Sequence, residues 1–314
     1  MPIPQSLALV VPIYNEARVL PELLRRLDDL FTARPEFKWT VIFVNDGSRD
    51  QSVEIVLAHV ARDPRYRLID LSRNFGHQAA LTAGLAHAGN HDAVVTMDAD
   101  LQDPPEIIPD LIAAWREGAE IVLASRRSRQ ENGLRRVGFD LFHRCFGKLT
   151  DFPIESNTGT FGLLSASAVA AFNSLPEKHR FFPGMRAWIG FRRGEVLYDR
   201  QKRAAGEPVV TFRKLVRYAL DGIFSFSHLP LRLLTYIGLF IAGCGFAVGA
   251  FFVARRLLGL EVAFTGFTTL VTLVLFLGGI QLIGIGVLGE YLGRIYDEVK
   301  HRPHYIVRNR VGFE

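Results

Sequence analysis

Short apolar runs alternate with helical periods through the first two thirds of the chain. The run Leu7 to Ile13 has the length of a buried strand, and Arg18 to Phe31 carries leucines at the spacing of one helix face. Further buried strands are predicted at residues 40–44, 67–71, 93–97, 120–124, 159–164 and 195–198. Because helix-compatible stretches separate most of these runs, the pattern predicts an α/β domain with a mostly parallel sheet over residues 1–210.

The last third of the chain contains two long stretches without a charged residue, Leu233 to Ala254 and Val262 to Gly289. Each is longer than the roughly 20 residues that a helix needs to cross a bilayer. Residues 231–289 are therefore predicted to form a transmembrane hairpin, with spans at about 233–254 and 265–289, and residues 290–314 a basic tail.

Residues 211–230 precede the hairpin and place apolar side chains at helical spacing, with Arg213, Lys214 and Arg217 beside that stripe. The pattern predicts an amphipathic helix that lies flat at the membrane interface. A helix packed on the soluble domain would show the same periodicity, so this alternative stays open.

Basic residues concentrate on the two flanks of the hairpin, whereas its connector carries only Arg255 and Arg256. By the positive-inside rule, both termini and the α/β domain are expected on the cytoplasmic side of a multi-pass membrane protein. Anionic lipid headgroups then explain the formal net charge of +5. Nucleic acid is not expected as a partner, because the sequence contains no nucleic-acid-binding motif.

Polar segments follow three of the predicted strands, and ligands of open α/β sheets bind beyond the carboxyl ends of strands. The segments are Pro12-Ile13-Tyr14-Asn15-Glu16, Asn45-Asp46-Gly47-Ser48 and Asp98-Ala99-Asp100-Leu101-Gln102. Alternate residues of an extended chain point the same way, so Asp98 and Asp100 are expected to converge with the Gln102 amide. Such oxygen ligands suit Mg²⁺ or Mn²⁺ together with the phosphates of a substrate. Taken singly, each segment could instead be a turn or a helix cap.

The order of these segments resembles that of the inverting family-two glycosyltransferases with the GT-A fold, and within them the polyprenyl-phosphate sugar transferases. The resemblance covers nearly the whole chain. It includes the three strand ends, Leu71-Ser72-Arg73-Asn74-Phe75-Gly76, Ser125-Arg126, the apolar hairpin, and Gly289-Glu290-Tyr291-Leu292-Gly293-Arg294 after it.

The resemblance implies a role for each residue of the candidate site. Pro12, Tyr14, Glu16, Asp46 and Asp98 would bind the nucleotide sugar, Asp98, Asp100 and Gln102 would surround the metal, and Asp100, Arg126 and Arg203 would serve catalysis. The two arginines would face phosphate groups, which a guanidinium binds with two parallel hydrogen bonds.

The sequence departs from the family pattern at two places. Thr160 stands where many relatives have an aspartate proposed as catalytic base, and Gly206-Glu207-Pro208-Val209 lacks the serine and lysine that usually follow the acceptor arginine. The identity of a base, and the contacts to the acceptor, are therefore open.

The resemblance implies transfer of a hexose from a nucleotide-diphosphate sugar, with the UDP-glucose type favoured, to undecaprenyl or dolichyl phosphate with inversion. Two alternatives remain at this point. One is a processive polysaccharide synthase, against which the missing Gln-x-x-Arg-Trp motif argues, and the other is a catalytically inactive membrane scaffold of the same fold. The transferred sugar, the choice of UDP or GDP, and the oligomeric state, a homo-oligomer included, are not determined by the sequence.

Overall fold

The computed structural model describes residues 6–127, 158–178, 180–199, 229–258 and 266–313. The described residues form two compact units, an α/β unit that includes the chain end from Arg302 onward and a helical unit. The strands are β1 (Ser6–Ile13), β2 (Lys38–Asn45), β3 (Tyr66–Leu71), β4 (Ala93–Thr96), β5 (Ile121–Arg126), β6 (Thr158–Ser165), β7 (Arg193–Tyr198) and β8 (Val307–Val311).

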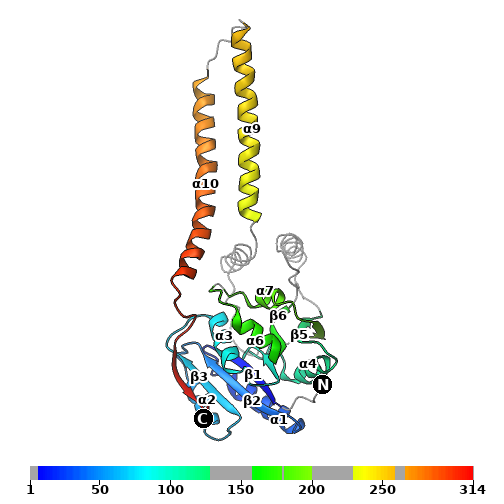
Figure 1. Cartoon of the computed structure of the whole chain (residues 1–314). Helices are drawn as coiled ribbons and strands as arrows, with labels where there is room; N and C mark the ends of the chain where they lie inside the picture. The colour runs from blue at the N-terminus through cyan, green and yellow to red at the C-terminus, as the bar shows by residue number, and fades with distance from the viewer. Residues whose placement is uncertain (1–5, 128–157, 179, 200–228, 259–265, 314) are drawn as a thin grey trace. The chain divides into compact units, whose positions relative to one another are not determined.

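These strands form one eight-stranded sheet in the order β7-β5-β6-β4-β1-β2-β3-β8 (Figure 1). The neighbours β4, β1, β2 and β3 are parallel, as are β5 and β7. β6 runs antiparallel between β4 and β5, and β8 runs antiparallel to β3 at the edge. The predicted α/β class with a largely parallel sheet is confirmed, with two antiparallel strands that the pattern did not distinguish.

Helices lie on both faces of the sheet. They are α1 (Leu20–Ala33), α2 (Ser52–Val60), α3 (His77–His87), the 3-10 helix η1 (Pro105–Ile107), α4 (Ile108–Arg116), α6 (Ala166–Ser174) and α7 (Phe182–Trp188). The stretch predicted as one helix from Pro104 to Trp115 begins as η1 and continues as α4.

Alternate residues of β1 face different layers of helices, which is why its whole apolar run is buried. Leu7 and Leu9 belong to a core cluster that includes the apolar stripe of α1, such as Leu23. On the opposite face, Val10 lies against α3 so closely that a Cβ on Gly84 would be 2.1 Å from its Cγ1. A side chain at position 84 would therefore require Val10 or α3 to shift.

The chain end, expected as a basic tail, contributes the edge strand β8 to the sheet. Its burial is low, because Arg308, Asn309 and Arg310 are exposed. An exposed edge strand carries no apolar run, and the apolar pattern of the sequence therefore gave no sign of it.

The helical unit contains α9 (Leu229–Leu257) and α10 (Phe267–Val299). Within the described residues, two segments are long and apolar enough to cross a membrane, Leu233–Phe251 and Phe276–Val299, with mean hydropathies of 1.9 and 1.4. Large apolar side chains are exposed along them, for example Phe240 at 72% and Phe246 at 81%. α10 continues beyond the predicted span 265–289 to Val299. The amphipathic helix predicted at 211–230 lies almost wholly outside the described residues.

Candidate active site

The loops that follow β1 and β2 are joined by reciprocal hydrogen bonds. The Asn15 backbone N–H donates to the Ser48 hydroxyl at 3.0 Å, and the Arg49 N–H donates to the Asn15 side-chain oxygen at 2.8 Å. Asn15 has a φ of 56°, a left-handed conformation that asparagine tolerates better than most residues. The first two polar segments of the sequence therefore meet at one edge of the sheet.

A second connection between these loops runs through Asp50. Its carboxylate accepts the Ala17 N–H at 3.0 Å and the Ser52 hydroxyl at 2.6 Å. Burial is the largest single effect and raises the pKa of Asp50, but the hydrogen bonds to its carboxylate, from the Ser52 hydroxyl and from backbone N–H groups including that of Ala17, together outweigh it, so the net pKa is below its ordinary value. The Ser52 hydroxyl in turn accepts the Glu16 N–H at 2.9 Å.

Asp46, directly after β2, is 3% exposed and holds a neighbouring loop. Its two carboxylate oxygens accept the N–H groups of Phe75 at 2.7 Å and Gly76 at 2.9 Å. Burial raises the pKa of Asp46, and these two bonds offset only part of that effect. Each oxygen retains a further lone pair, so the carboxylate can still accept a hydrogen bond from a ligand.

The predicted nucleoside residues of β1 differ in exposure. Tyr14 is 46% exposed just after the strand, whereas Pro12 is buried within it and pairs with Val44 of β2. Glu16 is partly buried, and its carbonyl accepts the N–H groups of Val19 and Leu20 at the start of α1. Tyr14 therefore presents the accessible aromatic face of this group.

The segment after β4 is a turn and not the extended chain assumed from the sequence. The strand ends at Thr96, and Asp100 accepts the Gln102 N–H at 3.1 Å. Leu101 has a φ of 59°, although it is buried at 4% exposure. Left-handed backbone at such a residue costs about 1 kcal/mol, so the surrounding fold imposes the turn. Alternation along an extended strand does not orient Asp100 and Gln102 here.

His77, at the start of α3, is a site residue that sequence reasoning missed. Its Nε2 lies 2.9 Å from Asp98 Oδ1, and the Thr160 hydroxyl donates to the same oxygen at 3.1 Å. Burial is the largest single effect and lowers the pKa of His77, but the hydrogen bond and charge of Asp98, together with the charges of Asp46 and Asp100, outweigh it, and the net pKa is raised. The carboxylates of all three aspartates thus act on one imidazole.

A second missed group connects the Asp98 segment to Arg126 at the end of β5. Tyr198, at the end of β7, donates its hydroxyl to the buried Asp103 and is also hydrogen-bonded to Arg126. Burial, reinforced by Asp103, raises the pKa of Tyr198. A Cβ on Gly159 would lie 3.4 Å from Arg126 Nη2, which places that guanidinium beside β6 near Thr160. Arg203 lies outside the described residues.

Among the described residues, no three His, Cys, Asp or Glu side chains gather as a complete metal-binding cluster. Asp98 and Asp100 nevertheless offer hard oxygen ligands close to His77. Mg²⁺ and Mn²⁺ use few carboxylates when substrate phosphates complete the coordination, so this donor set fits such an ion.

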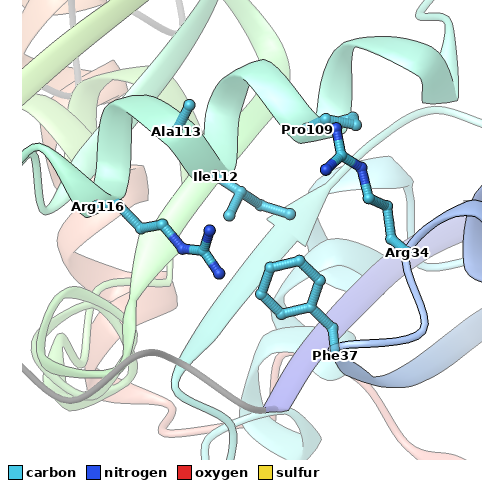
Figure 2. Close-up of a pocket in the computed structure, with 6 residues that line it drawn as sticks. All are labelled: Arg34, Phe37, Pro109, Ile112, Ala113 and Arg116. Atoms are coloured by element: carbon cyan, nitrogen blue, oxygen red, sulfur yellow. The ribbon is translucent and has the colours of Figure 1, made fainter.

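A small hollow of about 120 Å³ lies elsewhere on the α/β unit. Figure 2 shows its lining: Arg34, Phe37, Pro109, Ile112, Ala113 and Arg116. Arg116 stacks over the Phe37 ring at 4.9 Å. Phe37 directly precedes β2, whereas Asp46 directly follows it. The hollow therefore lies at the amino end of β2, and the candidate site lies at its carboxyl end.

The largely parallel sheet, with aspartates beyond the carboxyl ends of β2 and β4, has the features of an α/β domain that binds its ligand at these strand ends. The chain belongs to glycosyl transferase family 2, whose family model matches residues 8–169. The resemblance drawn from the motifs is thereby confirmed, and the chain is a glycosyltransferase.

Relatives are similar to nearly the full length of the chain. It is 43% identical to a bactoprenol glucosyl transferase of Shigella phage SfV, over 97% of this chain and 98% of that protein. It is 41% identical to a prophage bactoprenol glucosyl transferase homolog of Escherichia coli strain K12, over 96% and 98% of the two chains. Among solved structures, mannosyl-3-phosphoglycerate synthase from Rubrobacter xylanophilus matches with a TM-score of 0.47 at 17% identity, over 75% of each chain.

Proposed function

We propose that this chain transfers a hexose, with UDP-glucose as the favoured donor, to the phosphate of a polyprenyl lipid at the cytoplasmic membrane face. The observation that carries the proposal is the pair of acidic strand ends after β2 and β4, where Asp98 contacts His77 at 2.9 Å and the charges of Asp46 and Asp100 also act on that imidazole. Support comes from relatives named as bactoprenol glucosyl transferases, which match nearly the whole chain. The lipid acceptor also suits the two apolar helices.

The donor nucleoside would lie between the loops after β1 and β2. Tyr14 offers an exposed aromatic face for the base, and Asp46 has lone pairs left for a uracil or ribose donor group. Pro12 and Glu16 shape the same strand end. Because hydrogen bonds already join the two loops, little conformational entropy is lost when the nucleoside binds.

The donor diphosphate would lie beside the turn after β4. Asp98, Asp100 and Gln102 would hold Mg²⁺ or Mn²⁺, which supplies charge neutralisation for the leaving diphosphate. His77 and Thr160 both contact one oxygen of Asp98 and so fix the orientation of its carboxylate.

The acceptor phosphate would attack the sugar C1 in line with the leaving nucleoside diphosphate, which inverts the anomeric centre. A phosphate monoester has a second pKa near 6, so at pH 7 most of the acceptor is already dianionic and needs no protein base. This agrees with Thr160, which donates a hydrogen bond to Asp98 at 3.1 Å. Arg126 and Arg203 would orient the phosphate groups.

Anchoring would come from α9 and α10 as a membrane hairpin with both chain ends cytoplasmic. The basic flanks of the hairpin and the exposed apolar side chains of α9 support this arrangement. Residues 211–230 would lie at the interface beside the anionic headgroups.

Release of free UDP tests the proposed reaction. The purified full chain in detergent, with UDP-glucose and Mg²⁺, is expected to release UDP only when undecaprenyl phosphate is added. A parallel reaction with GDP-mannose tests the choice of nucleotide. No lipid-dependent release with either donor would contradict transfer of glucose or mannose to this lipid.

A further inference from the structure

The C-terminal segment reaches the edge of the sheet beside the loops that hold Asp46. β8 pairs with β3 through Leu68 and Val311, Ile69 and Arg310, Asp70 and Asn309, and Leu71 and Val307. The register shifts between Asp70 and Leu71, so Arg308 is an extra residue in β8. A β-bulge of this kind redirects a side chain away from the regular ladder.

Arg308 contacts two residues at the end of β3. Its Nη2 donates to the Ser72 carbonyl at 2.6 Å, and its Nη1 lies 3.6 Å from an Asp70 carboxylate oxygen. One guanidinium therefore joins β3 to the first residue of the loop that follows it.

A first route leads from Asp70 to the turn at Asp46. The Asn45 amide donates to Asp70 at 2.7 Å, and its oxygen accepts the Ser48 N–H at 3.0 Å. Asn45 is 2% exposed, so its side chain is largely shielded from competing water. The carboxylate that Arg308 contacts thus also holds the side chain that shapes the turn.

A second route leads through Ser72. Its N–H donates to the Ile306 carbonyl at 2.8 Å, and the loop then runs to Phe75 and Gly76, whose N–H groups bind Asp46. The turn and this loop are in tight contact, because a Cβ on Gly47 would lie 2.6 Å from the Asn74 nitrogen. A shift of the Ser72 loop would therefore move Asp46.

We propose that Arg308 is a positioning residue for the donor site, and that it holds Asp46 in place through Asp70 with Asn45 and through the Ser72 loop. The inference rests on the proposed function, in which Asp46 binds the donor nucleoside. Since α10 ends at Val299, only a short connector separates this residue from the helical unit.

The test uses the full chain in detergent, with UDP-glucose and undecaprenyl phosphate as substrates and UDP as the binding probe. Arg308→Ala is expected to raise the KM for UDP-glucose about three- to tenfold and to weaken UDP binding equally, because the lost contacts are partly exposed. The kcat and the KM for undecaprenyl phosphate should stay unchanged. Arg308→Lys should restore part of the loss, since it keeps the charge without the planar fork.

Arg310→Ala is the matched control, because Arg310 is exposed on the same strand and carries the same charge. It should leave UDP binding unchanged. If Arg308→Ala is too unstable to assay, Asp70→Asn should give the same rise in donor KM. Equal UDP binding by the unsubstituted chain, Arg308→Ala and Asp70→Asn would overturn the assignment alone, whereas failure of the unsubstituted chain to bind UDP would overturn the proposed function as well.

Discussion

At the scale of single residues, Asp46 and Asp98 are held in different ways. Asp46 accepts two backbone N–H groups of one loop, whereas Asp98 is contacted by the side chains of His77 and Thr160. Removing the Asp46 carboxylate would leave the partly buried N–H groups of Phe75 and Gly76 without this acceptor, at a cost of about 1 kcal/mol each. Substitutions near Asp98 should instead change chemistry more than stability, because its side chain is 34% exposed.

The charge of Asp100 can be tested by an isosteric change. Asp100→Asn is expected to lower kcat about 100-fold or more, because developing charge on the diphosphate would lose stabilisation. Removing divalent ions with a chelator should lower the kcat of the unsubstituted chain to a similar degree. Asp110→Asn, exposed on α4, is the control and should retain full activity. Undiminished turnover of Asp100→Asn in excess chelator would contradict a metal at this turn.

Asp50 joins the loops after β1 and β2, and its contribution to stability should depend on pH. Because the folded pKa of Asp50 is lowered, its stabilisation is present above the unfolded pKa of about 3.9 and is lost as pH falls through the folded value. Asp50→Asn should therefore lower the melting temperature at pH 7, with the difference shrinking below about pH 4.

Thermal melts across pH measure this difference, and Glu54→Gln on the exposed side of α2 is the control. A gap between Asp50→Asn and the unsubstituted chain that stays constant down to pH 3 would show that the carboxylate charge plays no part.

At the scale of elements, strands with apolar runs could be predicted and strands without them could not. β1 was predictable because both its faces are covered, as Leu9 and Val10 show. β8 has three exposed residues in its centre, and its pairing to β3 depends on a partner more than two hundred positions away in sequence. No local pattern contains that information.

The contact between α3 and β1 predicts an unusual result for a glycine in a helix. Gly84→Ala should destabilise the fold by about 1–3 kcal/mol, because the clash with Val10 outweighs the gain of about 1 kcal/mol in helix propensity. Chemical denaturation measures the change. Adding Val10→Ala should recover part of it, and a stabilised Gly84→Ala would show that α3 does not approach the sheet so closely.

At the scale of the whole molecule, part of the candidate site consists of motifs that can be read in the sequence. The rest consists of contacts between residues that are far apart in the sequence. Asp46, Asp98 and Asp100 follow strands, and the order of their segments along the chain made them candidates. His77 reaches Asp98 from another element, and Tyr198 reaches Asp103 across 95 positions of sequence. Such pairs become visible only after the strand order is known, and so does the left-handed turn at Leu101 between Asp100 and Gln102.

The proposed membrane attachment by α9 and α10 can be tested with salt. The full chain should stay with the membrane fraction in high salt and require detergent for extraction, because the exposed apolar surface of these helices is not screened by ions. A chain that ends at residue 228 should be released by salt. Release of the full chain by salt alone would contradict a transmembrane hairpin.

The most direct test of the whole account is the mass of the lipid product. Undecaprenyl phosphate incubated with the purified chain, Mg²⁺ and a panel of nucleotide sugars is expected to gain one hexose, with UDP-glucose the best donor, while Asp100→Asn forms this product about 100-fold more slowly or not at all. A lipid of unchanged mass with every donor, from a chain that still binds UDP, would contradict transfer to a polyprenyl phosphate.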